Sequence, residues 1–256
     1  MRKPPHLPRG VKFRIPLLRV LGGVLACVIL GLAGVWLVGQ STLESIGVQG
    51  DLTHNNAVTL RANVAPKLEG NFLTVDLEAA RAAFEAAPWV RRAVVKREFP
   101  NRLKVVLYEH KAIALWGTEG DARLVNSFGE IFEANPGDVE AEDLPLLNGP
   151  EDKAPLVLQA YQQLAVPFED MGDALAQLRL SGQGSWSAQL DSGAVIELGH
   201  GSVAELQARI RRFIGTVKPV AANFGRDLES ADLRYPNGYA IKLRGVTTGE
   251  SAGTDK

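Results

Sequence analysis

An uncharged apolar run near the N-terminus constrains the fold of this chain more than any other feature. Residues 20–38 read VLGGVLACVILGLAGVWLV and contain no charged side chain. A helix of this length rises about 1.5 Å per residue and spans roughly 28 Å, which matches the apolar thickness of a bilayer. The run therefore predicts a single transmembrane helix over residues 20–40.

Charged residues on either side of the run set its predicted orientation. The first 19 residues contain six basic side chains and no acidic one, and the first acid after the run is Glu44. Because basic flanks stay on the cytoplasmic side, residues 1–19 are predicted to form a cytoplasmic tail and the rest to be exported. A cleaved signal peptide is the alternative, but its apolar core would cover only about 7–15 residues and end in a small-residue cleavage site. No such site follows in VGQSTLESI.

The composition of the exported part argues against two classes of protein. Beyond the basic tail the chain holds 22 basic and 29 acidic residues, so it lacks the basic surface that binding to nucleic acid requires. The single cysteine, Cys27, lies inside the apolar run, so no intramolecular disulfide can form. We therefore predict no nucleic-acid partner and a folded part that its own core must stabilise.

The first exported segment, residues 43–111, predicts a small α+β domain. Alternating apolar residues indicate strands, whereas helical spacing with Asn or Asp caps indicates helices. The predicted elements are a strand closing at Gly50, a helix capped by Asn55 or Asn56, a helix from Asp76 that Pro88 ends, and strands over 90–99 and 103–108. This β-α-α-β-β order makes a small sheet that needs its helices packed on one face.

The second exported segment, residues 112–245, predicts a mainly antiparallel β domain with helices. Glycine and proline separate its apolar runs, which lie within residues 113–116, 122–134, 144–149, 175–181, 185–199 and 229–245. One helix is predicted over 154–164, and a second carries an apolar stripe made by Val203, Leu206, Ile210, Phe213, Ile214 and Val217. The last residues, 246–256, are rich in Gly, Thr and Ser and are predicted to be disordered.

Basic side chains of the second helix lie off its apolar stripe: Arg209, Arg211, Arg212 and Lys218. They predict a solvated face, and a docking patch for an acidic partner is the alternative. The acidic residues within 138–143 predict a solvated loop, with weak calcium binding as the alternative.

No motif in the chain predicts catalysis. The four histidines, at positions 6, 54, 110 and 200, do not pair with a histidine or an acid at the spacing of metal ligands, and no cysteine is exported. We therefore predict that the protein is not an enzyme and needs no cofactor or metal.

The last strand-like segment predicts a sheet edge at which another chain can bind. Residues 235–238, YPNG, are a tight-turn signal in which the glycine accepts positive φ. After the turn, one face is predicted to carry Tyr239, Ile241 and Leu243, and the other Ala240, Lys242 and Arg244. An edge strand exposes N–H and C=O groups that a second chain can satisfy by adding a strand. Alternatively, Lys242 and Arg244 are charges that protect the edge against such pairing.

Several of these segments resemble the FtsQ/DivIB family of bacterial cell division proteins. In the first segment the resemblance rests on Phe72-Leu73, Pro88-Trp89-Val90, Arg97 to Pro100, and Glu109 to Trp116. In the second, LVNSFGEIFEA resembles the family's V-D-x-x-G-x-x-F strand pair, and LPLLNGPE, Ser185-Trp186 and DLRYPNGYAIKL extend the match. Asn126 stands where an acid is usual, a departure that we do not expect to affect function. The resemblance covers about residues 10–245 and implies a POTRA domain over 43–111 and a β domain over 112–245.

The resemblance also implies partners and the residues that bind them. Family members bind FtsB, which travels with FtsL, through positions that match Arg234, Tyr235, Gly238, Tyr239, Ala240, Ile241, Lys242 and Leu243. Members can also use a basic residue shortly before the Ser-Trp pair. This chain has Gln183 and Gly184 there, so Arg179 is the candidate for that contact. The POTRA domain is implied to receive FtsK and other upstream division proteins through the strand around Val95.

These observations together predict an α+β protein with a single transmembrane helix, acting as a division scaffold in the bacterial inner membrane at the septum. Two alternatives stay open. An adaptor for envelope protein transport would be expected to carry a barrel or repeated POTRA units, and an anchored periplasmic enzyme would need a nucleophile with a neighbouring base.

Overall fold

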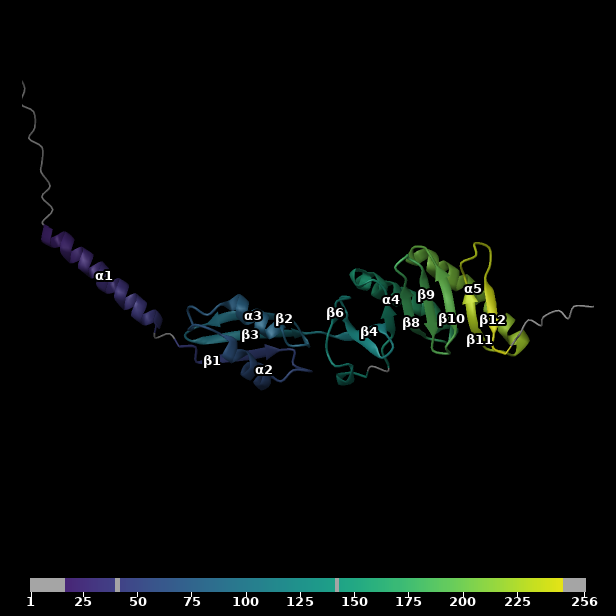
Figure 1. The fold of residues 1–256 in the computed structure, drawn as a ribbon, viewed down its shortest axis with the longest axis horizontal. Helices are drawn as coiled ribbons and strands as arrows, with labels where there is room; N and C mark the ends of the chain where they lie inside the picture. Colours follow the sequence, from purple (N-terminus) through teal and green to yellow (C-terminus); the bar gives the residue numbers. More distant parts are fainter. Residues whose placement is uncertain (1–16, 40–41, 141–142, 246–256) are drawn as a thin grey trace, which may run out of the picture. The chain divides into compact units, whose positions relative to one another are not determined.

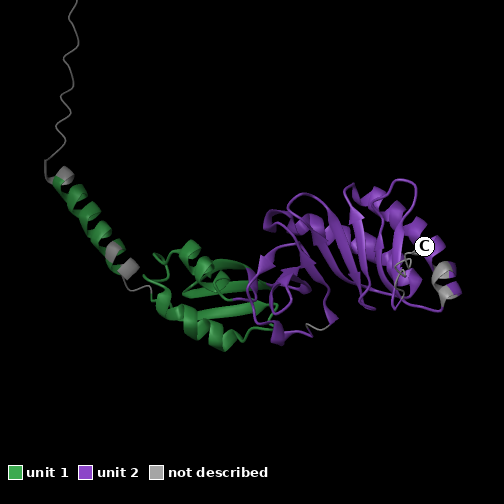
Figure 2. Cartoon of the chain, turned by 45° about the vertical axis from the view of Figure 1, so that its right-hand side comes forward, with its two compact units in different colours: residues 1–87, 92–108 green, residues 88–91, 109–256 purple. Residues whose placement is uncertain are grey.

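The computed structural model describes residues 17–39, 42–140 and 143–245, and the chain divides into two compact units (Figure 1, Figure 2). Unit 1 comprises residues 1–87 and 92–108, and unit 2 comprises residues 88–91 and 109–256. The predicted cytoplasmic tail as far as residue 16 and the predicted disordered end over 246–256 lie outside the described residues.

Helix α1, Leu17–Gly39, occupies the place of the predicted transmembrane helix. Its described apolar side chains are exposed, among them Leu21, Leu30 and Trp36. In the part of the chain that the structure describes, no helix is both long and apolar enough to cross a membrane.

The β-α-α-β-β order predicted for residues 43–111 is confirmed. The elements are β1 (Ser45–Gly50), α2 (Ala57–Val64), a 3-10 turn (Ala65–Lys67), α3 (Leu77–Glu85), β2 (Val90–Glu98) and β3 (Arg102–Glu109). The strands form one sheet in the order β1-β3-β2, and β1 runs parallel to β3. Asn56 caps α2 by accepting a hydrogen bond from the Val58 amide, and Asp76 caps α3 by accepting two.

The strands of residues 112–245 form one sheet (Figure 1). The elements are β4 (Ala112–Thr118), β5 (Asp121–Asn126), β6 (Ile131–Phe132), β7 (Leu146–Asn148), α4 (Ala154–Met171), β8 (Leu175–Leu180), β9 (Trp186–Leu190), β10 (Val195–Gly199), α5 (Val203–Phe224), β11 (Leu228–Asp232) and β12 (Ala240–Leu243). The order across this nine-stranded sheet is β12-β11-β10-β9-β8-β7-β4-β5-β6.

The prediction of a mainly antiparallel sheet is confirmed, but three neighbouring pairs are parallel: β4 with β7, β7 with β8, and β10 with β11. Helix α4 lies between β7 and β8 in the chain, and α5 lies between β10 and β11. A helix between two strands returns the chain to its starting end, so the strands that it joins run in parallel.

Helices α4 and α5 bury their apolar sides in the core of unit 2. The stripe predicted for α5 is confirmed, since Leu206, Ile210 and Phe213 are fully buried. Helix α4 runs seven residues beyond its predicted end at residue 164, through Pro167. Phe168 is also fully buried, so its burial in the core holds the last turn despite the missing proline N–H.

The arginines of α5 lie on an exposed or half-buried face, as predicted, and two of them also donate to backbone oxygens. The Arg209 guanidinium donates to the carbonyl oxygens of Leu198 and His200 at 2.8 and 2.7 Å, and Arg212 donates to that of Pro236 at 3.2 Å. Both side chains therefore tie loops of the sheet to α5, because the free carbonyls at strand ends need a donor.

Candidate functional site

Strand β12 ends the nine-stranded sheet, so the prediction of an edge strand is confirmed. Strand β11 pairs with one side of it, and no other described strand pairs with the opposite side. The Arg244 N–H donates to the Asp227 oxygen at 2.9 Å, toward β11. Successive residues of a strand direct their peptide groups to opposite sides, so the N–H and C=O groups of Ile241 and Leu243 face away from β11. This free side of residues 240–243 is called the β12 edge.

The side chains of β12 alternate as the sequence predicts. Leu243 is buried, Tyr239 and Ile241 are half-buried against the core, and Ala240 and Lys242 are exposed. The Tyr239 ring meets the Phe213 ring edge-on at 5.1 Å, and its hydroxyl lies 2.7 Å from the Thr216 hydroxyl. Tyr239 therefore supports β12 from the helix side, and replacing it would disturb the strand as well as any partner contact.

The two charges that could protect the β12 edge are turned toward the chain's own sheet. The Lys242 ammonium forms an ion pair with Glu229 of β11, and the Arg244 guanidinium donates to the Ser192 carbonyl in the turn between β9 and β10. Each side chain therefore has a partner within unit 2, and the Lys242 side chain stays 61% exposed on the edge strand.

The loop between β11 and β12 holds four of the predicted binding residues: Arg234, Tyr235, Gly238 and Tyr239. Arg234 pairs with Asp232 through two hydrogen bonds of 2.8 and 2.6 Å, which raises the pKa of Arg234 and lowers that of Asp232. The Arg234 side chain crosses Gly199, where a Cβ atom would lie 2.8 Å from Arg234 Cγ. Tyr235 is 57% exposed and makes a suitable anchor for a partner.

The backbone conformation of Gly238 differs from the prediction. The turn lies at Pro236 and Asn237, but Gly238 does not adopt a positive φ, and the space around it is open. The reason given for a glycine at this position, tolerance of left-handed backbone, was therefore wrong.

One face of the nine-stranded sheet carries mostly polar side chains next to the β12 edge. The paired registers align Arg179, Ser187, Glu197, Asp232 and Ala240 in one row across β8 to β12. A hollow of about 350 Å³ opens at the β12 end of this row, lined by Val195, Glu197, Ser230, Asp232, Ala240 and Lys242 among others. A strand added at the β12 edge would place alternate side chains next to this hollow.

Of the two remaining candidates, Arg179 lies away from the β12 edge and Val95 belongs to the other unit. Arg179 is exposed on β8, four strands from β12, which is roughly 19 Å at about 4.8 Å per strand. A partner bound at the β12 edge could contact Arg179 only if it also crossed the sheet face along the row from Ala240 to Arg179. Val95 is half-buried on β2, which is itself an edge strand of the three-stranded sheet.

Comparison with known proteins identifies the family of this chain. Residues 41–110 match the family described as "POTRA domain, FtsQ-type", and residues 114–234 match "Cell division protein FtsQ/DivIB, C-terminal". The chain belongs to the FtsQ/DivIB family of cell division proteins.

Relatives named "Cell division protein FtsQ" are similar to this chain over most of its length. The relative from Burkholderia pseudomallei is 41% identical over 226 residues, which cover 87% of this chain and 89% of the relative. The relative from Thiomonas arsenitoxydans is 38% identical over 247 residues, 95% of this chain and 91% of the relative. The relative from Bordetella pertussis is 37% identical over 242 residues, 86% of this chain and 87% of the relative.

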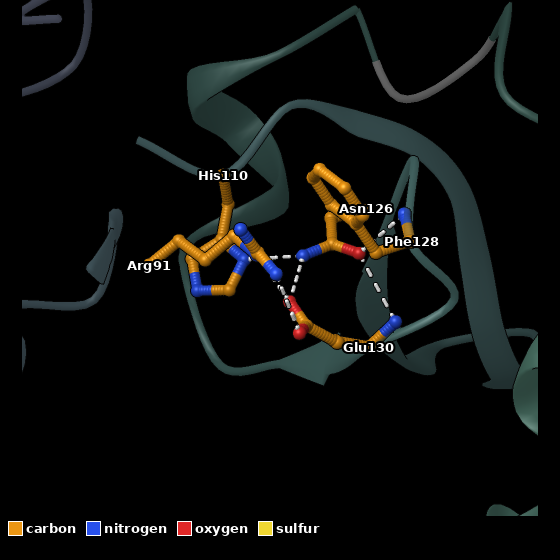
Figure 3. Close-up of polar contacts among 5 residues, drawn as sticks. All are labelled: Arg91, His110, Asn126, Phe128 and Glu130. Atoms are coloured by element: carbon orange, nitrogen blue, oxygen red, sulfur yellow. Dashed lines mark hydrogen bonds and ion pairs between the residues drawn. The ribbon is translucent and has the colours of Figure 1, made fainter. Parts of the chain in front are cut away.

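The strand pair that resembles the FtsQ/DivIB pattern contains a polar cluster that sequence reasoning missed (Figure 3). Asn126 is fully buried, and its Oδ1 accepts hydrogen bonds from the Phe128 and Glu130 amides at 2.9 and 3.0 Å. Its Nδ2 donates to His110 Nδ1 at 2.8 Å and to the Glu130 carboxylate at 2.6 Å. Arg91 pairs with Glu130 and lies 3.8 Å above the centre of the Phe128 ring.

The hydrogen bond between Asn126 and His110 determines the protonation state of His110. An amide nitrogen only donates, so His110 Nδ1 accepts and the imidazole is neutral. Burial lowers the pKa of His110 below its usual 6.5; the Glu130 carboxylate opposes this shift and the Arg91 charge adds to it. The hydrogen bond from Arg91 is the main cause that lowers the pKa of Glu130.

We expect acid to destabilise unit 2 through this cluster. Because the folded-state pKa of His110 lies below 6.5, the unfolded chain takes up the proton first and stability falls as the pH drops through 6.5. Protonation of Glu130 also lowers the stability of unit 2 as the pH falls, because its folded-state pKa lies below the ordinary value. Thermal unfolding at pH 7.5, 6.5 and 5.5 measures the slope, and His110→Gln should flatten it in this range. An equal slope in wild type and variant would contradict the assignment.

The described residues contain no group of three or more His, Cys, Asp or Glu side chains that could hold a metal ion. One acid of the predicted solvated loop has a structural role instead, because the Asp138 carboxylate accepts a hydrogen bond from Trp89 Nε1 at 3.1 Å. Residues 141–142 of that loop lie outside the described residues.

Proposed function

We propose that this FtsQ/DivIB chain is a scaffold of the division machinery that captures FtsB, and FtsL with it, by accepting a strand at the β12 edge. The observation that carries the proposal is the orientation of β12: one side is paired with β11, and the amides of Ile241 and Leu243 point to the other. A partner strand would complete these hydrogen bonds, and Arg234 and Tyr235 would contact it at the loop.

Three further features of the structure support strand addition at this place. The side chains of Lys242 and Arg244 are held by Glu229 and by the Ser192 oxygen of the same unit. Tyr239 and Leu243 hold the strand against the core, so the edge is preformed and binding needs little ordering of the chain. The hollow beside Asp232 and Lys242 can receive side chains of the added strand.

The proposal places the chain in the bacterial inner membrane at the division septum. Residues 1–19 would stay in the cytoplasm and residues 20–40 would cross the bilayer, because the run of residues 20–38 carries no charge and only its N-terminal flank is basic. The exposed apolar side chains of α1 support this assignment, since none of the described residues covers them. Residues 43–111 and 112–245 would then be the periplasmic POTRA and β domains.

The POTRA domain is proposed to receive upstream partners such as FtsK. Its strand β2 lies at the edge of the three-stranded sheet and carries Val95, so this strand offers a second surface at which a chain can pair.

Replacement of Tyr235 by alanine tests the proposal at its exposed anchor. We expect Tyr235→Ala to weaken binding of the periplasmic part of FtsB by about tenfold, because a well-placed tyrosine contributes roughly 1–2 kcal/mol at an interface. Calorimetry on the reconstituted chain measures the change. Tyr108→Ala is the matched control, since Tyr108 is similarly exposed but lies on β3. Unchanged affinity in Tyr235→Ala would remove this residue from the site.

A further inference from the structure

A large apolar side chain is exposed where β2 turns into β3. Phe99 is 77% exposed, and its ring meets the buried ring of Phe72 edge-on with centroids 5.2 Å apart. Leu73, next to Phe72 in the chain, is 40% exposed. Phe99, Pro100 and Leu73 are called the hairpin tip. The proposed capture of FtsB at β12 makes no use of it.

Hydrogen bonds hold the loop that carries Leu73. The Arg97 guanidinium donates to the carbonyl oxygens of Phe72 at 2.8 Å, Leu73 at 3.2 Å and Val75 at 2.7 Å. The Asn71 carboxamide oxygen accepts from the Leu73 amide at 3.0 Å, which closes the same loop. Apolar side chains that are exposed next to one another on such a loop can form part of an interaction surface.

Hydrogen bonds tie the hairpin tip to the residues that follow α1. The Glu44 amide donates to the Asn101 oxygen at 3.0 Å, and Asn101 Nδ2 donates to the Glu44 carboxylate. Glu44 comes five residues after Gly39, the last residue of α1. Five residues span at most about 17 Å, so the tip is tethered close to the point where α1 ends.

Basic side chains surround the tip in the sequence. Residues 96–104 read KREFPNRLK, with four basic residues and one acid, Glu98. The Arg102 side chain is half exposed, and its guanidinium lies 3.9 Å from Glu98. An apolar tip flanked by cations is suited to an anionic lipid surface. Phenylalanine can insert at the boundary below the headgroups, while arginine and lysine bind the phosphates.

We propose that the hairpin tip inserts Phe99 and Leu73 into the surface of the bilayer next to α1 and so fixes the orientation of the POTRA domain on the membrane. The inference rests on the proposed anchor, because the tether brings the tip to a membrane only if α1 lies in one. It is independent of the proposed binding of FtsB at β12, which lies in the other unit.

A label on residue 99 tests the contact in the full chain. Phe99→Cys and Tyr108→Cys, each in a Cys27→Ser background, are labelled with an environment-sensitive fluorophore. The variants are reconstituted into vesicles of phosphatidylethanolamine and phosphatidylglycerol that contain a lipid with a nitroxide on its headgroup. Tyr108 is the matched control, because it is exposed on the same strand pair but lies about 20 Å along β3 from Arg102, at roughly 3.3 Å per residue.

We expect the nitroxide lipid to quench more than about half of the emission of the label at residue 99 and little of that at residue 108. Replacing phosphatidylglycerol with phosphatidylcholine should reduce the quenching at residue 99 several-fold, since the basic flanks lose their attraction. Equal quenching at the two positions would overturn the proposal, as would shielding of residue 99 that develops only when another division protein is added. Flotation of the chain with the vesicles tests the anchor separately: a chain that does not float refutes the anchor, and a floating chain without selective quenching refutes the tip contact alone.

Discussion

Replacement of Ile241 by proline should weaken FtsB binding by at least about thirtyfold, or 2 kcal/mol, and leave the β domain folded. Proline removes the N–H of Ile241, which faces away from β11, and its ring blocks the approach of a partner strand. The hydrogen bonds between β11 and β12 survive, because the peptide groups of Ala240 and Lys242 face β11. Edge strands accept proline where the lost N–H faced outward. Calorimetry with the periplasmic part of FtsB measures the loss of affinity.

Ile241→Val is the control for that experiment. It keeps the N–H and a β-branched side chain at the same place, so FtsB should bind within about threefold of wild type. Far-ultraviolet circular dichroism should be the same for both variants. Wild-type affinity in the folded proline variant would show that the partner does not pair along Ile241.

Replacement of Asn126 by alanine should lower the free energy of unfolding of unit 2 by about 2–4 kcal/mol. The side chain is fully buried and accepts from two amide groups, those of Phe128 and Glu130, which alanine would leave without an acceptor. Denaturant unfolding followed by tryptophan fluorescence measures the change. The signal is suited to this purpose, because Trp89, Trp116 and Trp186 are all buried in unit 2.

Asn126→Asp is the matched control, because it restores the residue that the family pattern usually has. Its carboxylate keeps an acceptor for both amides but loses the hydrogen bond to Glu130 and repels that carboxylate, so it should recover only part of the stability lost in Asn126→Ala. A negative charge next to His110 Nδ1 favours the imidazolium, so the pKa of His110 should move upward from its lowered value. Equal destabilisation by alanine and aspartate would contradict the role assigned to the Asn126 oxygen.

Local signals in the sequence were enough to predict most elements of the fold. Caps at Asn56 and Asp76 and the stripe through Leu206, Ile210 and Phe213 depend on neighbours in the chain, and the structure shows each of them as predicted. The three parallel strand pairs could not be predicted in this way. Two of them join strands on either side of a helix and the third, β4 with β7, joins strands on either side of β5 and β6, so packing over long distances decides all three. The extension of α4 past Pro167 has the same cause, since the burial of Phe168 is a property of the whole core.

The candidate site was predictable where it depends on alternation and not where it depends on three-dimensional contacts. The edge position of β12 and the faces of its side chains agree with the sequence pattern. The pairing of Lys242 with Glu229 and of Arg244 with Ser192 joins segments that the sequence could not connect. The same is true of the Asn126 cluster, which assembles Arg91, His110 and Glu130 from three places in the chain.

Amide hydrogen exchange along β12 tests the central claim, an unpaired strand edge that FtsB completes. In the free chain, the Ile241 and Leu243 amides should exchange fast and the Lys242 amide slowly, because only the last faces β11. Addition of the periplasmic part of FtsB should slow exchange at Ile241 and Leu243 by at least about a hundredfold and leave Lys242 little changed. Protection of Ile241 and Leu243 already in the free chain, or fast exchange at both in the complex, would contradict the account.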